Sequence, residues 1–87
     1  MNDYRVDVRV VPREGILDPQ GKAVAGALAS LGFETVDEVH VGRLITLRMR
    51  AASEEAARAQ AEAMCRQLLA NPVTEDFQVE VREEVHA

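Results

Sequence analysis

Few side chains in this 87-residue sequence could do chemistry: one cysteine, Cys65, and two histidines, His40 and His86. A cysteine acts as a nucleophile only with a base nearby, and Cys65 lies between Ala61 and Leu68 on the apolar stripe of an expected helix. We therefore interpret Cys65 as a buried structural thiol. The histidines show no metal-ligand spacing with Cys65 or with each other. The sequence predicts no metal site, and a surface position for His40.

Pairs of adjacent acidic residues do not predict an acid–base site, because neighbours in sequence point in different directions on a helix or strand. The pairs are Asp37-Glu38, Glu54-Glu55, Glu75-Asp76 and Glu83-Glu84. Glu54-Glu55 suits the first turn of a helix, where the dipole favours negative charge. Both serines are expected at helix ends, and Ser53 is the expected N-cap of the second helix. Gly32 follows the first helix, where a left-handed residue is expected. We predict no catalytic and no cofactor-binding residue in this chain.

A loop with a glycine at each end, residues 15–21, precedes the first expected helix. Such a loop can hold a phosphate on its backbone N–H groups. Here Asp18 would accept those hydrogen bonds with its own carboxylate, and Pro19 lacks a donor. We therefore interpret the loop as structural, with Asp18 as the helix N-cap. Ile16 and Leu17 are apolar residues in a loop, which indicates a contact surface.

Hydropathy periods predict the elements that must position these residues. Alternating apolar residues predict strands near 4–10, 36–41, 45–49 and 77–81, and helical stripes predict helices from Pro19 to Leu31 and from Glu54 to Ala70. Gly42-Arg43 is expected as a tight turn between the second and third strands. This order predicts an α+β, two-layer, ferredoxin-like β-α-β-β-α-β fold, with both helices on one face of an antiparallel sheet.

The opposite face of that sheet is expected to be bare and to carry both signs of charge. Its residues would be Arg5, Asp7, Arg9, Thr46, Arg48, Gln78, Glu80 and Arg82. Such a face suits water, or a symmetric partner that pairs the charges. An 87-residue chain also has a thin core. Together these features predict a symmetric oligomer, either a dimer or a dimer of dimers.

Composition excludes several classes of protein. The net charge is −5, which lacks the long-range attraction to phosphate that nucleic-acid binding requires. No apolar run approaches the roughly 18 residues of a membrane span, no signal peptide is evident, and one cysteine cannot form an internal disulfide. We expect a cytoplasmic protein that binds neither nucleic acid nor membrane. Residues 1–87 are expected to form a single domain, with residues 83–87 as a frayed tail.

Four stretches taken together are more specific than any single motif. They are residues 15–21 (GILDPQG), residues 23–33, residues 39–43 and residues 65–77 with LLANPV and EDF. In order and spacing the chain resembles the PurS family, the small subunit of phosphoribosylformylglycinamidine synthase, over residues 4–82. It departs from the family at His40, where a basic residue is more frequent.

The resemblance implies a subunit without an active site of its own, within an ATP-dependent amidoligase complex of purine biosynthesis. That enzyme makes formylglycinamidine ribonucleotide from formylglycinamide ribonucleotide, glutamine and ATP. The resemblance also implies that ATP and Mg²⁺ are used by the synthetase subunit, PurL, and that the glutaminase subunit, PurQ, releases ammonia. PurS-like subunits bridge the two as a dimer or tetramer and help ammonia to pass.

Two loops are candidate partner contacts, because core packing does not explain their residues. The candidates are Ile16, Leu17 and Gln20 on the first loop and Pro72, Glu75 and Asp76 on the second. We expect the two loops at opposite ends of their strands, where they would serve separate partners.

One alternative function remains open at this stage, a small-molecule-binding, ACT-like regulatory module. The same order of strands and helices occurs in ACT-like domains, which also dimerise. That alternative rests on fold order alone. Asp18-Pro19 does not favour a ligand site in the loop.

Overall fold

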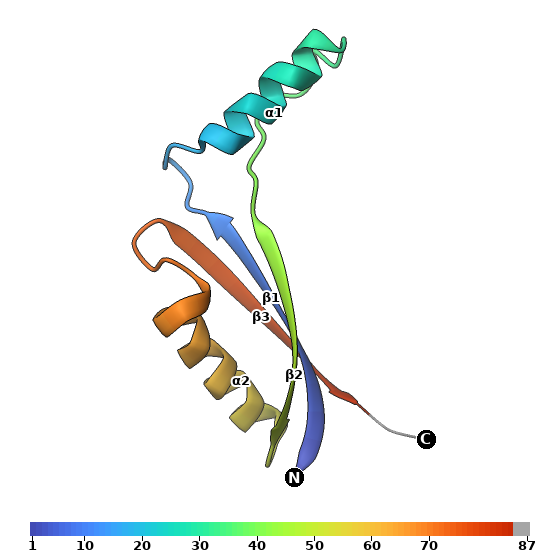
Figure 1. Cartoon of the computed structure of the whole chain (residues 1–87), viewed down its shortest axis with the longest axis vertical. Helices are drawn as coiled ribbons and strands as arrows, with labels where there is room; N and C mark the ends of the chain where they lie inside the picture. The colour runs from blue at the N-terminus through green and yellow to red at the C-terminus, as the bar shows by residue number, and fades with distance from the viewer. Residues whose placement is uncertain (85–87) are drawn as a thin grey trace.

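The structure, a computed structural model, describes residues 1–84 and forms a three-stranded antiparallel sheet with two helices. The strands are β1 (Asn2–Pro12), β2 (Arg43–Ala51) and β3 (Glu75–Glu84), in the order β2-β1-β3. The helices are α1 (Pro19–Ser30) and α2 (Glu54–Met64), and a π-helical turn, η1 (Cys65–Leu69), continues α2 (Figure 1). The α+β class and the antiparallel sheet are confirmed.

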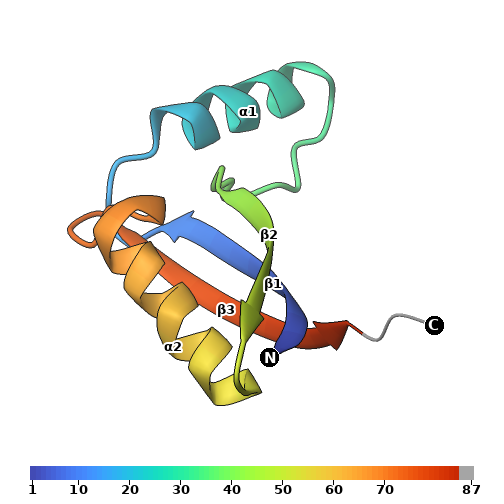
Figure 2. The ribbon, with the colours of Figure 1, turned by 60° about the horizontal axis from the view of Figure 1, so that its bottom comes forward.

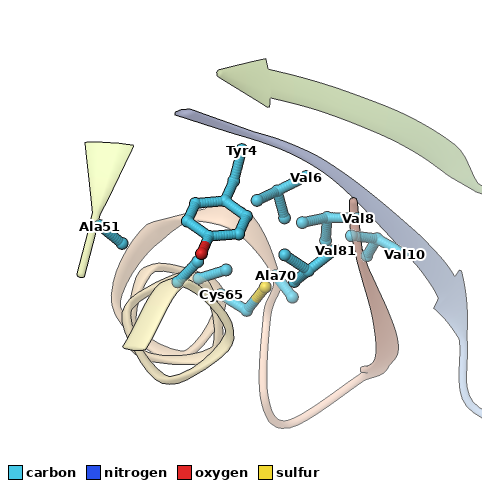
Figure 3. Close-up of a cluster of buried hydrophobic side chains, with 10 residues drawn as sticks. Tyr4, Val6, Val8, Val10, Ala51, Cys65, Ala70 and Val81 are labelled. Atoms are coloured by element: carbon cyan, nitrogen blue, oxygen red, sulfur yellow. The ribbon is translucent and has the colours of Figure 1, made fainter. Parts of the chain in front are cut away.

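The core lies between the central strand β1 and α2. Tyr4, Val6, Val8 and Val10 alternate along one face of β1 and are buried. They pack towards α2 and η1, whose buried residues include Cys65 (Figure 3). Alanines at the buried positions of α2 allow the helix to approach the sheet closely. Ser53 caps α2 as predicted, because its hydroxyl accepts a hydrogen bond from the Ala56 N–H at 3.1 Å.

The second helix of the predicted helical layer, α1, does not lie on the sheet. Figures 1 and 2 show α1 beyond the end of the strands, where it leaves α2 alone on its face of the sheet. Gly21 is the buried residue of α1, and Leu31, at its end, is 73% exposed. The prediction that both helices pack on one face was therefore wrong for α1. An apolar stripe shows which side of a helix is suited to burial, but it does not show which surface packs against that side.

The molecule is consequently elongated. The Cα radius of gyration is 16.7 Å, whereas a compact chain of this length would have about 12 Å. Residues 13–42, called the arm below, contain α1 and its two connections. The arm projects from the end of the sheet (Figure 1).

The predicted second strand, residues 36–41, is not a strand. This segment has no regular secondary structure, and β2 begins directly after it at Arg43. The valines that suggested a strand are not strictly alternating, since Val36 and Val39 are three residues apart. The Val41 N–H bonds to a carboxylate oxygen of Asp18 at 2.9 Å rather than to a neighbouring strand. The sheet thus has three strands in the described chain, not four.

Gly42 is not in a hairpin turn either. It passes so close to β1 that a Cβ at this position would overlap the carbonyl oxygen of Val10. Gly32, by contrast, follows α1 with a φ of 97°, the left-handed conformation predicted for a helix C-terminus.

At the other end of the chain, β3 continues through Glu84. The first two residues of the predicted tail, 83–84, therefore lie in a strand, and residues 85–87 lie outside the described residues. Within residues 1–84, neither helix is long and apolar enough to cross a membrane.

Candidate functional site

The two candidate contact loops lie at the same end of the sheet. β1 and β3 are antiparallel neighbours, with Pro12 opposite Glu75. The Arg13 N–H then donates to the Thr74 carbonyl oxygen at 2.9 Å, which joins the loop after β1 to the loop before β3. The expectation of opposite ends was wrong, because in an antiparallel pair the end of one strand lies beside the start of the other.

These loops surround a shallow hollow of about 380 Å³, called the loop-end hollow below. Four of the six candidate residues line it: Ile16, Leu17, Gln20 and Glu75. Leu17 is 68% exposed, so a large apolar side chain stands open to solvent at the rim. An apolar anchor beside polar groups is the composition of a protein contact rather than of a core.

The other two candidates, Pro72 and Asp76, hold the neighbouring loop to Arg13. The Arg13 guanidinium donates through Nη2 to the Pro72 carbonyl oxygen at 2.6 Å, and its Nε lies 3.2 Å from Asp76 Oδ1. All of these groups are largely exposed. The contact therefore sets the shape of the loop more than the stability of the chain.

Glu75 has a structural role that sequence reasoning missed. Its two carboxylate oxygens accept from Nη1 and Nη2 of Arg43 at 2.8 and 3.1 Å, and it also accepts from the Asn71 N–H at 2.7 Å. The hydrogen bonds from Arg43 are the main cause that lowers the pKa of Glu75 below its usual value. Arg43 Nη2 also donates to the Leu69 carbonyl oxygen at 2.6 Å. This bidentate pair clamps the start of β2 to the loop that follows η1.

No local sequence pattern predicts the ion pair between Arg43 and Glu75, because the two residues are 32 positions apart. The only signal available was that Glu75 had no other evident role. The sequence predicts Arg43 in a hairpin turn, whereas the structure places it on the loop-end hollow.

Asp18 ties the arm together. It caps α1 as predicted, since Oδ1 accepts from the Gly21 N–H at 3.0 Å, and Oδ2 accepts from the Val41 N–H at 2.9 Å. These hydrogen bonds, the one from Gly21 first, lower the pKa of Asp18. Gly21 is required at this crossing, because a Cβ there would overlap the Val39 carbonyl oxygen. The carboxylate thus occupies the donors that an anion would need at the start of α1.

His40 lies on the surface, as predicted. Its Nδ1 is 3.8 Å from Asp18 Oδ2 and its Nε2 is 3.9 Å from Glu38 Oε2. The ring therefore lies between two carboxylates.

Cys65 is completely buried, as predicted, and burial raises the pKa of its thiol. A high pKa keeps the thiol protonated and unreactive. Among residues 1–84, no three histidine, cysteine or acidic side chains come together in a way that could hold a metal ion.

The family comparison decides what kind of protein carries these loops. A family model described as PurS, phosphoribosylformylglycinamidine (FGAM) synthase, matches residues 5–83. The chain belongs to the PurS family. It is a PurS subunit of FGAM synthase, in purine biosynthesis.

Relatives support the assignment over nearly the whole length. The FGAM synthase subunit PurS of Methanocaldococcus jannaschii is 37% identical over 78 residues, which is 90% of this chain and 94% of that protein. The solved structure of Bacillus subtilis PurS matches with a TM-score of 0.81 at 40% identity and covers 92% of this chain and 99% of that one. A chain in the PurLQS structure of Thermotoga maritima matches with a TM-score of 0.81 at 30% identity, covering 97% and 100%.

Proposed function

We propose that this PurS subunit is a non-catalytic assembly subunit that joins PurQ, the glutaminase, to PurL, the synthetase, and assists the passage of ammonia between them. One observation carries the proposal: the loop-end hollow exposes apolar side chains on a frame held by hydrogen bonds. The matched Thermotoga maritima chain comes from a structure described as PurLQS, so that relative assembles with its partner subunits.

The frame around the hollow suits a binding surface. Arg43 holds Glu75, Arg13 holds the loop at Pro72, and Asp18 holds the segment that precedes β2. A surface that is already ordered loses less conformational entropy when a partner binds. Leu17 and Ile16 then supply apolar area to bury in the contact.

In this proposal, PurQ releases ammonia from glutamine and PurL carries out the ATP-dependent synthesis. ATP and Mg²⁺ would bind to the synthetase, and this chain would bind neither. The complex would work in the cytoplasm, where purine biosynthesis takes place.

Self-association is the second part of the proposal, as a dimer or tetramer. The arm exposes Val24, Leu31 and Phe33, which are 41, 73 and 56% exposed, although they belong to the apolar side of α1 and its C-terminal turn. A second copy of the chain would bury apolar surface that one copy alone leaves in water.

Reconstitution with purified PurL and PurQ tests the role. With this chain present, we expect glutamine-dependent synthesis of formylglycinamidine ribonucleotide to rise well above the rate of PurL and PurQ alone. Synthesis from added ammonium with PurL alone should change little. Equal glutamine-dependent rates with and without the chain would contradict the proposal.

A further inference from the structure

The loop between η1 and β3 holds one apolar side chain out into solvent. This loop, residues 70–75 and called the tip loop below, projects from the end of the sheet at which the arm begins (Figure 1). Within it, Val73 is 74% exposed. A single exposed apolar residue is common on protein surfaces. Val73 differs from the common case because the backbone that carries it is highly ordered.

Asn71 organises the tip loop from within. Its Oδ1 accepts from the Val73 N–H at 3.0 Å. Its carbonyl oxygen accepts from the N–H groups of Thr74 and Glu75 at 3.2 and 2.8 Å. Its own N–H donates to the Glu75 carboxylate at 2.7 Å. One residue thus fixes the backbone on both sides of Val73.

The rest of the tip loop has no free N–H group either. The Ala70 N–H donates to the Cys65 carbonyl oxygen at 3.0 Å, and Pro72 has no N–H to donate. Every backbone donor of residues 70–75 is therefore already used within the chain. A partner cannot bind this loop by accepting hydrogen bonds from its backbone, as it would bind an open loop or strand edge.

Two arginines fix the tip loop to the rest of the molecule. Arg43 Nη2 donates to the Leu69 carbonyl oxygen at 2.6 Å, directly before the loop. Arg13 donates through Nη2 to the Pro72 carbonyl oxygen at 2.6 Å and through its backbone N–H to the Thr74 carbonyl oxygen at 2.9 Å. The position of Val73 is therefore set before any partner arrives, and binding costs little further ordering of the loop.

The tip loop also forms part of the wall of the loop-end hollow. Thr74 and Glu75 line the hollow, and Val73 precedes them directly in the chain. A protein surface that covers Leu17 at the hollow is thus expected to reach Val73 as well. The loop offers this surface an apolar side chain and no backbone donor, so an apolar socket is the chemistry that fits it.

We propose that Val73 enters an apolar socket on the larger subunit that covers the loop-end hollow, and that Asn71 is the residue that positions it. The inference rests on the proposed function and names a contact residue that the sequence did not indicate. Glu75, a candidate contact on the same loop, instead turns its carboxylate to Arg43 and to the Asn71 N–H.

Val73→Thr tests the socket, because threonine keeps the shape of valine and replaces one methyl group with a hydroxyl. In solvent this change costs little, but in an apolar socket it buries an unpaired hydroxyl. We expect affinity for one larger subunit to fall at least about fivefold, measured by titration calorimetry against purified PurL and PurQ separately. Leu17→Asp should weaken binding to that same subunit. Circular dichroism and thermal melting confirm that each variant is folded.

Val36→Thr is the matched control. Val36 is 40% exposed and lies outside both the tip loop and the loop-end hollow. The same exchange of a methyl group for a hydroxyl is made there, away from the proposed contact. We expect the affinity for both larger subunits to stay within about twofold of wild type.

Asn71→Ala tests the positioning role. Loss of Oδ1 frees the Val73 N–H, so hydrogen exchange of residues 73–75 should become faster and affinity should fall. Asn71→Ser, which keeps an acceptor oxygen, should restore part of both. If Asn71 acts through Val73, the double variant Asn71→Ala/Val73→Thr should lose less affinity than the two single losses combined. A purely structural role would lower thermal stability and leave the affinity of the folded variant unchanged.

Several results would overturn the inference. If wild type binds and Leu17→Asp weakens binding, but Val73→Thr binds like wild type, the proposed function stands and the tip loop is not in the contact. If Val73→Thr and Leu17→Asp affect different subunits, the single partner is wrong. If Val73→Thr weakens only self-association in sedimentation velocity, a second copy covers Val73 instead. If wild type binds neither PurL nor PurQ, the proposed function fails and this inference fails with it.

Discussion

The sheet with α2 and the arm are held together by different forces. The ten buried apolar residues of the core all belong to the sheet, to α2 with η1, or to the residues directly beside them. In the arm, Gly21 is the buried residue, and polar contacts centred on Asp18 maintain the shape. The sheet with α2 is stabilised by apolar side chains that are buried within it. The arm is shaped by hydrogen bonds, and its apolar side is exposed to solvent. The first region therefore contains an apolar core of its own, and the second has an apolar side that nothing in the described chain covers.

A matched pair of valine substitutions gives the largest expected contrast. Val8 on β1 is fully buried, while Val24 on α1 is 41% exposed. Val8→Ala should lower the free energy of unfolding by about 2 kcal/mol, between the usual costs of Ile→Val and Leu→Ala in a core. Val24→Ala should change it by less than about 0.5 kcal/mol. Urea denaturation at low protein concentration measures both, and equal costs would remove the distinction between the two regions.

Cys65→Ser tests whether the buried core between the sheet and α2 has only a structural role. The substitution puts a hydroxyl into an apolar site, and we expect a loss of about 1–3 kcal/mol in the free energy of unfolding. Glutamine-dependent synthesis by the reconstituted complex should be unchanged once the variant is folded. Activity lost from a fully stable variant would give Cys65 a role that burial does not explain.

Leu17→Asp tests whether the loop-end hollow binds the larger subunits. The side chain is exposed, so the free energy of unfolding should change little, but binding to the larger subunits should weaken by at least about 1–2 kcal/mol. Leu68→Asp is the matched control, since Leu68 is also exposed but does not line the loop-end hollow. Binding can be measured by co-purification with PurL and PurQ and by titration calorimetry. Equal binding by both variants and wild type would remove the hollow as a contact.

Glu75→Gln tests the junction between the two regions and has the smallest expected effect. The pKa of Glu75 is lowered in the folded chain, so its contribution to stability is present above the unfolded pKa near 4.5 and disappears as the pH falls through the folded pKa. At pH 7 the substitution should cost about 1 kcal/mol, the upper range for a partly exposed ion pair. The difference from wild type should shrink below pH 4.5. A difference that stays constant down to pH 2 would contradict this assignment.

Local patterns were good predictors wherever the deciding interaction lies within a few residues. The alternation on β1, β2 and β3, the caps at Asp18 and Ser53, and the left-handed Gly32 are all confirmed. Each depends on hydrogen bonds or side-chain directions set by neighbours in the chain. The predicted strand at 36–41 failed because its backbone is held by Asp18, a residue 23 positions from Val41.

The candidate site was predicted in part. Core packing does not explain four of the candidate residues, and the structure brings them to one hollow: Ile16, Leu17, Gln20 and Glu75. Their place at a common end was mispredicted, and Arg43 was missed. Whether these residues contact PurL or PurQ remains a prediction.

The sequence by itself determined the three strands of the sheet, the buried valine face, both helices and membership of the PurS family. These follow from residue types at fixed short spacings and from motifs in a fixed order. Only the tertiary structure decided that α1 leaves the sheet, that the two loops meet, that Arg43 clamps Glu75, and that Arg13 holds the loop at Pro72. Each of these depends on how distant segments are placed against one another, and a local pattern shows which groups need a partner without showing which partner they reach.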